Sequence, residues 1–140
     1  MTLKAVEMVA ELMALSARTA PKGRGHDSII IKIVTGEELR QLALELRRLG
    51  EAQGLGFYLR DAGNLAESDA CVIIGSRALD YVGLNCGGCG FATCSEMLSA
   101  QKGFHEMDKP FHGPNCIIKM ADLGIALGSA AKTASLHNVD

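Results

Sequence analysis

The spacing of the cysteines constrains this chain more than any other feature of its sequence. Three of the five, Cys86, Cys89 and Cys94, fall within nine residues, and Cys116 follows after 21 intervening residues. Cysteines that cluster in this way indicate metal binding or redox chemistry in a compartment where disulfides are rare. Cys71 stands apart from them. We therefore expect four cysteines to act together and the fifth to be separate.

The pattern Cys-x2-Cys-x4-Cys-x21-Cys suits an iron–sulfur cluster. A [4Fe–4S] cluster needs four thiolates, one for each iron, and here a short loop would supply three of them. Gly87, Gly88 and Gly90 let that loop adopt left-handed conformations and approach the cluster closely. Successive backbone N–H groups in such a loop form a nest for an anion. The sequence therefore predicts one [4Fe–4S] cluster with four ligands: Cys86, Cys89, Cys94 and Cys116.

Helix starts are expected beside the last two ligands. The pattern predicts a helix over residues 92–102 and a long one over residues 116–136, with Asn115 as the N-cap of the second. The positive end of each helix dipole would stabilise a negative cluster by roughly 0.3–1 kcal/mol. Four apolar side chains are expected to keep water away from it: Phe91, Met97, Phe104 and Phe111.

Two other interpretations use some of the same cysteines. A structural zinc ion also takes four thiolates, but usually from two spaced pairs. A redox-active dithiol of Cys86 and Cys89 would leave Cys94 and Cys116 without a role. The three-plus-one layout therefore favours the iron–sulfur cluster over both.

The remaining candidate side chains have weaker patterns. Cys71 lies in an apolar run and is expected to be a small buried side chain. His105 and His112 fall between the third and fourth ligands and could tune or replace one, although exposed loop histidines are commoner. The sequence singles out no catalytic residue.

The rest of the chain predicts an α/β fold in a single domain, residues 1–140. A capping box at Thr35 and Glu38 is expected to begin the second helix, which ends near Gly50 or Gly54. We expect a small sheet of three or four strands packed with helices, with a Cys-rich iron–sulfur segment, residues 84–118, at one end. The other predicted elements are a helix over residues 3–18 and strands over 28–34, 57–60 and 69–75.

Composition narrows the classes of function. The net charge is −2 and the pI about 6.1, with no basic stripe, which argues against nucleic acid as a partner. The apolar stretches are too short for a membrane span, so we expect no membrane insertion. Glu7 and Glu11 interrupt the first apolar run, unlike a signal peptide. A cytoplasmic protein is therefore expected.

The chain resembles a family of uncharacterised prokaryotic proteins described as containing a ferredoxin domain. The resemblance covers nearly the whole chain, and the core Cys-x2-Cys-Gly-x3-Cys is also similar to the iron–sulfur domain of corrinoid iron–sulfur proteins and of membrane electron-transport complexes in anaerobes. It implies the same four ligands and electron transfer to a redox partner protein. The motifs that carry it are residues 17–21, 33–36, 84–91, 113–116, 122–129, 132–135 and 137–139.

Members of that family continue for several tens of residues past the position of Asp140, into another helix and strand. This leaves two expectations for the present chain: dependence on a partner, or a truncated form of a longer protein. A homo-oligomer is a separate expectation.

A second resemblance is to nitroreductase-like flavoproteins. It rests on residues 17–21, an Ala-Pro turn after an apolar helix, and on residues 122–126, an Asp-x-Gly-x-Ala helix. It implies a flavin-dependent oxidoreductase that the cluster feeds, with FMN as a second cofactor. Arg18, Lys22 and Arg24 would then hold the flavin phosphate. The alternative is a basic turn that simply faces solvent, and we favour it.

Overall fold

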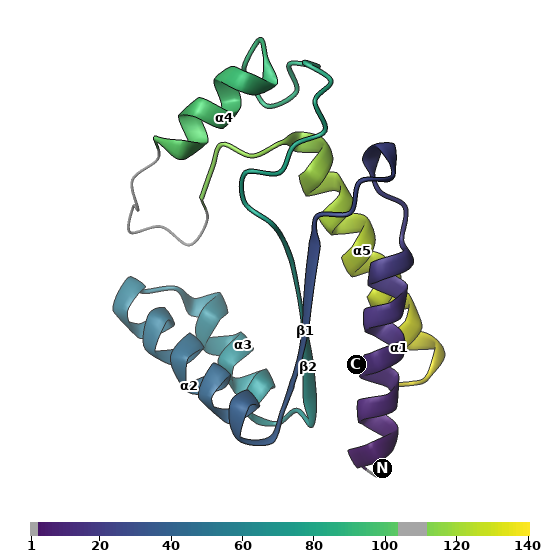
Figure 1. The fold of residues 1–140 in the computed structure, drawn as a ribbon. Coiled ribbons are helices and arrows are strands. Elements are labelled where there is room, and N and C mark those ends of the chain that lie inside the picture. The colour runs from purple at the N-terminus through teal and green to yellow at the C-terminus, as the bar shows by residue number, and fades with distance from the viewer. Residues whose placement is uncertain (1–2, 104–111) are drawn as a thin grey trace.

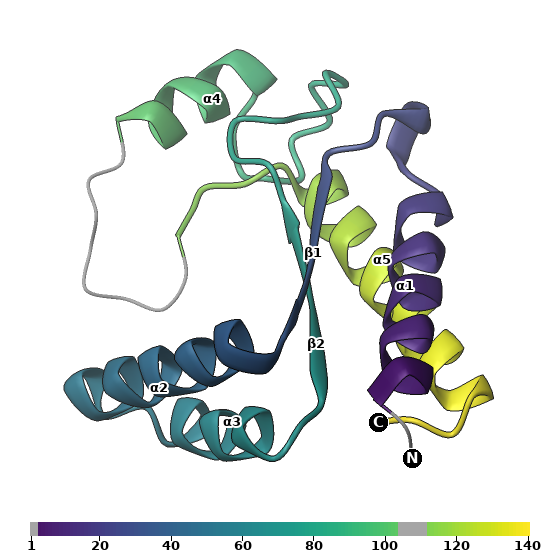
Figure 2. The same cartoon turned by 60° about the horizontal axis from the view of Figure 1, so that its bottom comes forward.

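A computed structural model describes residues 3–103 and 112–140 (Figure 1). It places helices on a small sheet, with the Cys-rich segment at one end of the strands and a helical hairpin at the other (Figure 2). The elements in chain order are α1 (Leu3–Thr19), the 3₁₀ turn η1 (Gly23–Gly25), β1 (Ile29–Thr35), α2 (Gly36–Gln53), α3 (Gly56–Ala66), β2 (Ala70–Ser76), α4 (Cys94–Lys102) and α5 (Ile117–Leu136).

The sheet confirms the predicted class, a small sheet packed with helices. Strands β1 and β2 are antiparallel, with Ile29 opposite Ser76 and Thr35 opposite Ala70. Within residues 3–103 and 112–140 the sheet has two strands, where three or four were expected. The predicted strand over residues 57–60 is the one that differs, because this segment belongs to α3.

Close packing on α2 explains why residues 57–60 are helical. Phe57 and Tyr58 favour strands by propensity, but that preference is weak and depends on context. A Cβ atom at Gly50 of α2 would lie 2.9 Å from Leu59 Cδ2 and 3.0 Å from Tyr58 Cβ. The glycine therefore lets α3 pack against α2, and this tertiary contact outweighs the local preference.

The core lies between the sheet and the helices α1 and α5, which lie side by side in both views. Its fully buried residues are small or β-branched: Ala17, Ile29, Ala126 and Ala130. The alanines let the two helix axes approach, and Ser16 Oγ and Thr133 Oγ1 are hydrogen-bonded across them at 2.6 Å. The position of α5 is thus fixed by α1 and the sheet, far along the helix from its first turn.

A buried ion pair joins the first turns of α5 to the turn η1. Lys119 is 1% exposed, and its Nζ donates to Asp122 Oδ2 at 3.2 Å and to the carbonyl oxygen of His26 at 2.5 Å. Asp122 Oδ1 accepts the backbone N–H of Gly23 at 2.9 Å. Both charges are therefore hydrogen-bonded as well as paired, as buried charges require.

In the described part of the chain, none of the helices combines the length and apolarity needed to cross a membrane.

Candidate metal centre

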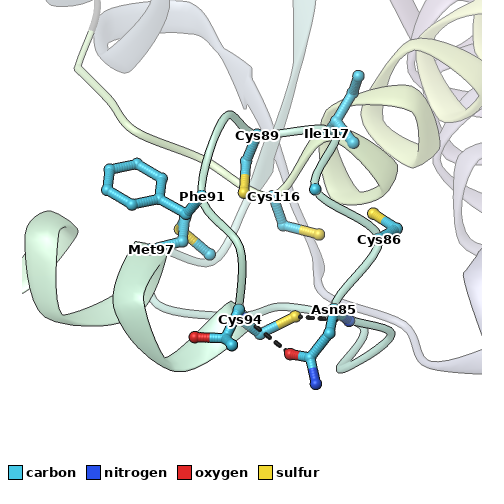
Figure 3. Close-up of a pocket in the computed structure, with 10 residues that line it drawn as sticks. Asn85, Cys86, Cys89, Phe91, Cys94, Met97, Cys116 and Ile117 are labelled. Carbon is cyan, nitrogen blue, oxygen red and sulfur yellow. Dashed lines mark hydrogen bonds between the residues drawn. The ribbon is translucent and has the colours of Figure 1, made fainter.

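Cys86, Cys89, Cys94 and Cys116 line one small pocket together with Asn85 and Met97. Figure 3 shows the four sulfur atoms directed from different sides toward a common space. Cys71 lies elsewhere, in β2 opposite Val34, and is half-buried rather than fully buried. The structure thus groups the cysteines as their spacing predicts.

The conformation of the loop that carries the first two cysteines depends on its glycines. Gly87 and Gly90 have φ values of 74° and 90°, and Gly90 N–H donates to the carbonyl oxygen of Gly87 at 3.0 Å. Gly88 has a different role, because a Cβ atom there would lie 2.6 Å from Ile117 Cγ2. The loop therefore rests directly on the first residue of α5, which brings it beside Cys116.

Helix α4 delivers the third cysteine. Thr93 is its N-cap and forms a capping box with Glu96: Glu96 N–H donates to Thr93 Oγ1 at 3.2 Å, and Thr93 N–H donates to Glu96 Oε2 at 3.1 Å. Helix α4 therefore begins at Cys94, two residues later than predicted. One turn on, Met97 is 1% exposed and lines the pocket.

Helix α5 delivers the fourth cysteine. Cys116 itself is the N-cap, so the prediction that Asn115 takes this position is wrong by one residue. Asn115 instead uses its amide to fix the approach to the helix: Oδ1 accepts from Gln101 Nε2 at 2.9 Å, and Nδ2 donates to the carbonyl oxygen of His112 at 2.6 Å. His112 itself is exposed and is not among the residues that line the pocket.

Gln101 of α4 joins the two segments that lead into the pocket. Besides its bond to Asn115, its Oε1 accepts the backbone N–H of Leu79 at 3.0 Å. Leu79 lies on the segment leading to Cys86, and Asn115 directly precedes Cys116. The Gln101 side chain therefore holds the segment before Cys86 and the segment before Cys116 against α4.

Burial differs across the four cysteines. Cys116 is 8% exposed, Cys89 and Cys94 are half-buried, and Cys86 is exposed. A group held by all four thiols would be open to solvent on the Cys86 side. Phe91 and Met97, two of the four predicted shielding residues, line the pocket. Phe104, Phe111 and His105 lie outside the described residues.

The four thiols lie around one pocket (Figure 3). Among residues 3–103 and 112–140, no three Cys, His, Asp or Glu side chains come close enough together to share one metal ion.

The end of α1 and the turn that follows it carry three cations, and two of them form hydrogen bonds within the protein. Arg18 Nη1 donates to Asp27 Oδ2 at 2.6 Å and to the carbonyl oxygen of Ile29 at 2.7 Å. Lys22 Nζ donates to the carbonyl oxygens of residues 17 and 18 at the end of α1. Arg24 is exposed. The predicted role of Arg18, Lys22 and Arg24 in holding a flavin phosphate draws no support from these contacts and stays a prediction.

Comparison with known proteins agrees with the first resemblance drawn from the motifs and does not show the second, to nitroreductase-like flavoproteins. A family described as "Uncharacterized protein containing a ferredoxin domain" matches residues 112–140, which include Cys116. An uncharacterised protein of Archaeoglobus fulgidus is 42% identical over 135 residues, which are 96% of this chain and 71% of that protein. No solved structure matches. The chain therefore belongs to the family of uncharacterised proteins that contain a ferredoxin domain.

Proposed function

We propose that this protein binds one [4Fe–4S] cluster through Cys86, Cys89, Cys94 and Cys116 and exchanges electrons with a redox partner protein. The observation that carries the proposal is that four thiols from three separate segments line one pocket and are directed into it (Figure 3). Such clusters are held by Cys thiolates, one for each iron. Residues 84–118 would then be the cluster segment of a single domain spanning residues 1–140.

The surroundings of the thiols suit a negatively charged group. Helix α4 begins at Cys94, and α5 begins directly after Cys116, so two helix N-termini face the pocket. The positive ends of their dipoles favour negative charge. Phe91 and Met97 add apolar surface, which limits solvent access and thereby affects the reduction potential.

The arrangement of the sulfurs favours a cluster over a structural zinc ion. A zinc ion holds thiolate ligands about 2.3 Å from one point. In a [4Fe–4S] cluster each thiolate binds a different iron, so the sulfurs lie around a common body. The four thiols here line one pocket, which suits a cluster with one thiolate on each iron.

Electrons would cross the surface beside Cys86, because this is the exposed ligand of the four. Ile117, which lines the pocket, is 50% exposed, and so is Leu84, two residues before Cys86 in the chain. Exposed apolar surface next to a redox centre is suited to brief contact with another protein. A partner protein is therefore a better-matched acceptor than a substrate enclosed in a deep cavity.

Anaerobic loading with iron and sulfide tests the proposal. The wild-type protein should turn brown and bind about four irons and four sulfides per chain. Cys116→Ser should lose most of this iron, because it removes the buried ligand, while Cys71→Ser should keep it. A colourless protein that holds one zinc ion would contradict the proposal, and so would loss of colour in Cys71→Ser.

A further inference from the structure

We propose that Asn85 is a positioning residue that couples the first and third cluster ligands and donates a hydrogen bond to the sulfur of the third. The inference rests on the proposed function, since it treats Cys86 and Cys94 as ligands. Asn85 directly precedes Cys86 in the chain and faces Cys94 across the pocket (Figure 3).

Two hydrogen bonds tie Asn85 to Cys94 in opposite directions. The backbone N–H of Asn85 donates to Cys94 Sγ at 3.3 Å. In return, Asn85 Oδ1 accepts the backbone N–H of Cys94 at 2.8 Å. The loop before the first ligand and the first residue of α4 are therefore held together by one residue.

The residue type fits this position for two reasons. Asn85 has φ 48°, a left-handed conformation that asparagine tolerates far better than most side chains do. The N–H of Cys94 is also one of the first backbone donors of α4, which have no partner inside the helix. Thr93 satisfies the N–H of Glu96, and Asn85 satisfies that of Cys94, so the helix is capped by two separate segments.

The backbone bond to sulfur has a chemical consequence. Hydrogen bonds to the sulfurs of an iron–sulfur centre are among the features that set its reduction potential. A donor aimed at a thiolate stabilises the more negative, reduced state more than the oxidised state, and so raises the potential. The side-chain bond instead fixes where the sulfur of Cys94 lies, as the outer partners of metal ligands do.

Two variants separate these roles. Asn85→Gly keeps the left-handed backbone and its N–H but removes Oδ1. It should release iron to a chelator about tenfold faster than wild type, in line with losses of outer partners at metal sites, with little change in potential. Asn85→Val also disfavours the left-handed backbone, so it should show faster iron loss together with a lower potential. Asn85→Asp keeps the acceptor oxygen and should recover most of the retention lost in Asn85→Gly.

Asn138 provides a matched control, because it has φ 54° just beyond α5 and lies away from the pocket. Asn138→Val imposes the same backbone strain and should change neither the potential nor the rate of iron loss. The proposal is overturned if Asn85→Val keeps the wild-type potential and rate, or if Asn138→Val shifts them as far.

A measurement on the iron-free protein keeps this inference distinct from the proposed function. In Asn85→Gly, iodoacetamide should alkylate Cys94 several-fold faster relative to Cys89 than in the wild type, because the side-chain bond from Oδ1 to the Cys94 backbone is gone. An unchanged ratio overturns the contact itself. Wild-type protein that takes up no cluster would instead overturn the proposed function, and with it the effect of Asn85 on a potential.

Discussion

Lys119 is a single side chain on which the start of α5 depends. Replacing it by Met keeps much of its volume but leaves the buried carboxylate of Asp122 without its cation. We expect Lys119→Met to lower the free energy of unfolding by about 3–5 kcal/mol, the usual effect of breaking a buried pair from one side. Chemical denaturation of the iron-free protein measures this.

Two further variants serve as comparisons for Lys119→Met. The double variant Lys119→Met, Asp122→Leu removes both charges and should be more stable than Lys119→Met alone. Lys32→Met breaks the exposed pair with Glu38 and should change the free energy of unfolding by less than about 1 kcal/mol. If Lys119→Met and Lys32→Met lower the free energy of unfolding equally, burial of the ion pair does not determine its contribution to stability.

The alkylation rate of Cys71 should depend on pH differently from that of Cys86, which can be tested. Burial in β2 raises the pKa of its thiol. Because the thiolate is the reactive form, a raised pKa means less thiolate at a given pH and slower alkylation. In the iron-free protein, Cys71 should react later than the exposed Cys86 between about pH 7 and 9, and its rate should rise at higher pH.

Timed alkylation followed by peptide mass spectrometry measures both rates. In urea, where the protein is unfolded, the two alkylation rates should become similar. Cys71 reacting as fast as Cys86 at every pH of the folded protein would be incompatible with its position in the structure.

Residue type decides which parts of the site could be predicted. The cysteines and glycines stand out in the sequence because ligation and positive φ each require few residue types. Asn85 and Gln101 do not stand out, because an amide has no fixed role until its partners are known. Gln101 binds groups 22 residues before it and 14 residues after it, so its role depends on the folded chain.

At the scale of helices and strands, the β-branched and apolar runs predicted both strands to within one residue. The strands expected over residues 28–34 and 69–75 are Ile29–Thr35 and Ala70–Ser76. The capping box expected at Thr35 and Glu38 is wrong: Thr35 is the N-cap of α2, but its side chain makes no capping bond. Glu38 instead pairs with Lys32 of β1, a competing partner that the local pattern does not contain.

The contact between α2 and α3 gives the prediction at this scale. Gly50→Ala adds a Cβ atom 2.9 Å from Leu59 and should lower the free energy of unfolding by about 1–3 kcal/mol through overpacking. Gly63 lies inside α3 with nothing within 4 Å of an added Cβ, so Gly63→Ala should stabilise the protein by roughly 0.5–1 kcal/mol. Thermal unfolding compares the two variants. If both stabilise, residues 57–60 do not pack on α2 as a helix.

At the scale of the whole molecule, the Cys-rich segment and the core are held by different means. Helices α1 and α5 pack on each other and on the sheet, whereas α4 makes few contacts with the other described elements. The segment is held instead by the amides of Asn85 and Gln101 and by the contact of Gly88 with Ile117. A cluster bound by four thiolates would add the strongest link, because it joins three chain segments at once.

Removal of iron should therefore loosen one end of the molecule and leave the other intact. Metal binding contributes free energy to the parts of the chain that its ligands hold together. In hydrogen exchange under anaerobic conditions, peptides covering residues 85–102 should exchange at least about tenfold faster without iron than with it, because local opening depends on local contacts. Peptides covering β1 should exchange at the same rate in both states, since Ile29 is buried in a core cluster that contains no cysteine ligand. Peptides from the start of α5 should show an intermediate increase in exchange rate. Cys116 loses its bond to iron, while Lys119 and Asp122 keep the hydrogen bond between them. If loss of iron speeds hydrogen exchange equally in β1 and α4, the cluster supports the whole fold. If it speeds exchange in neither, the four thiols do not bind a shared group that stabilises this segment.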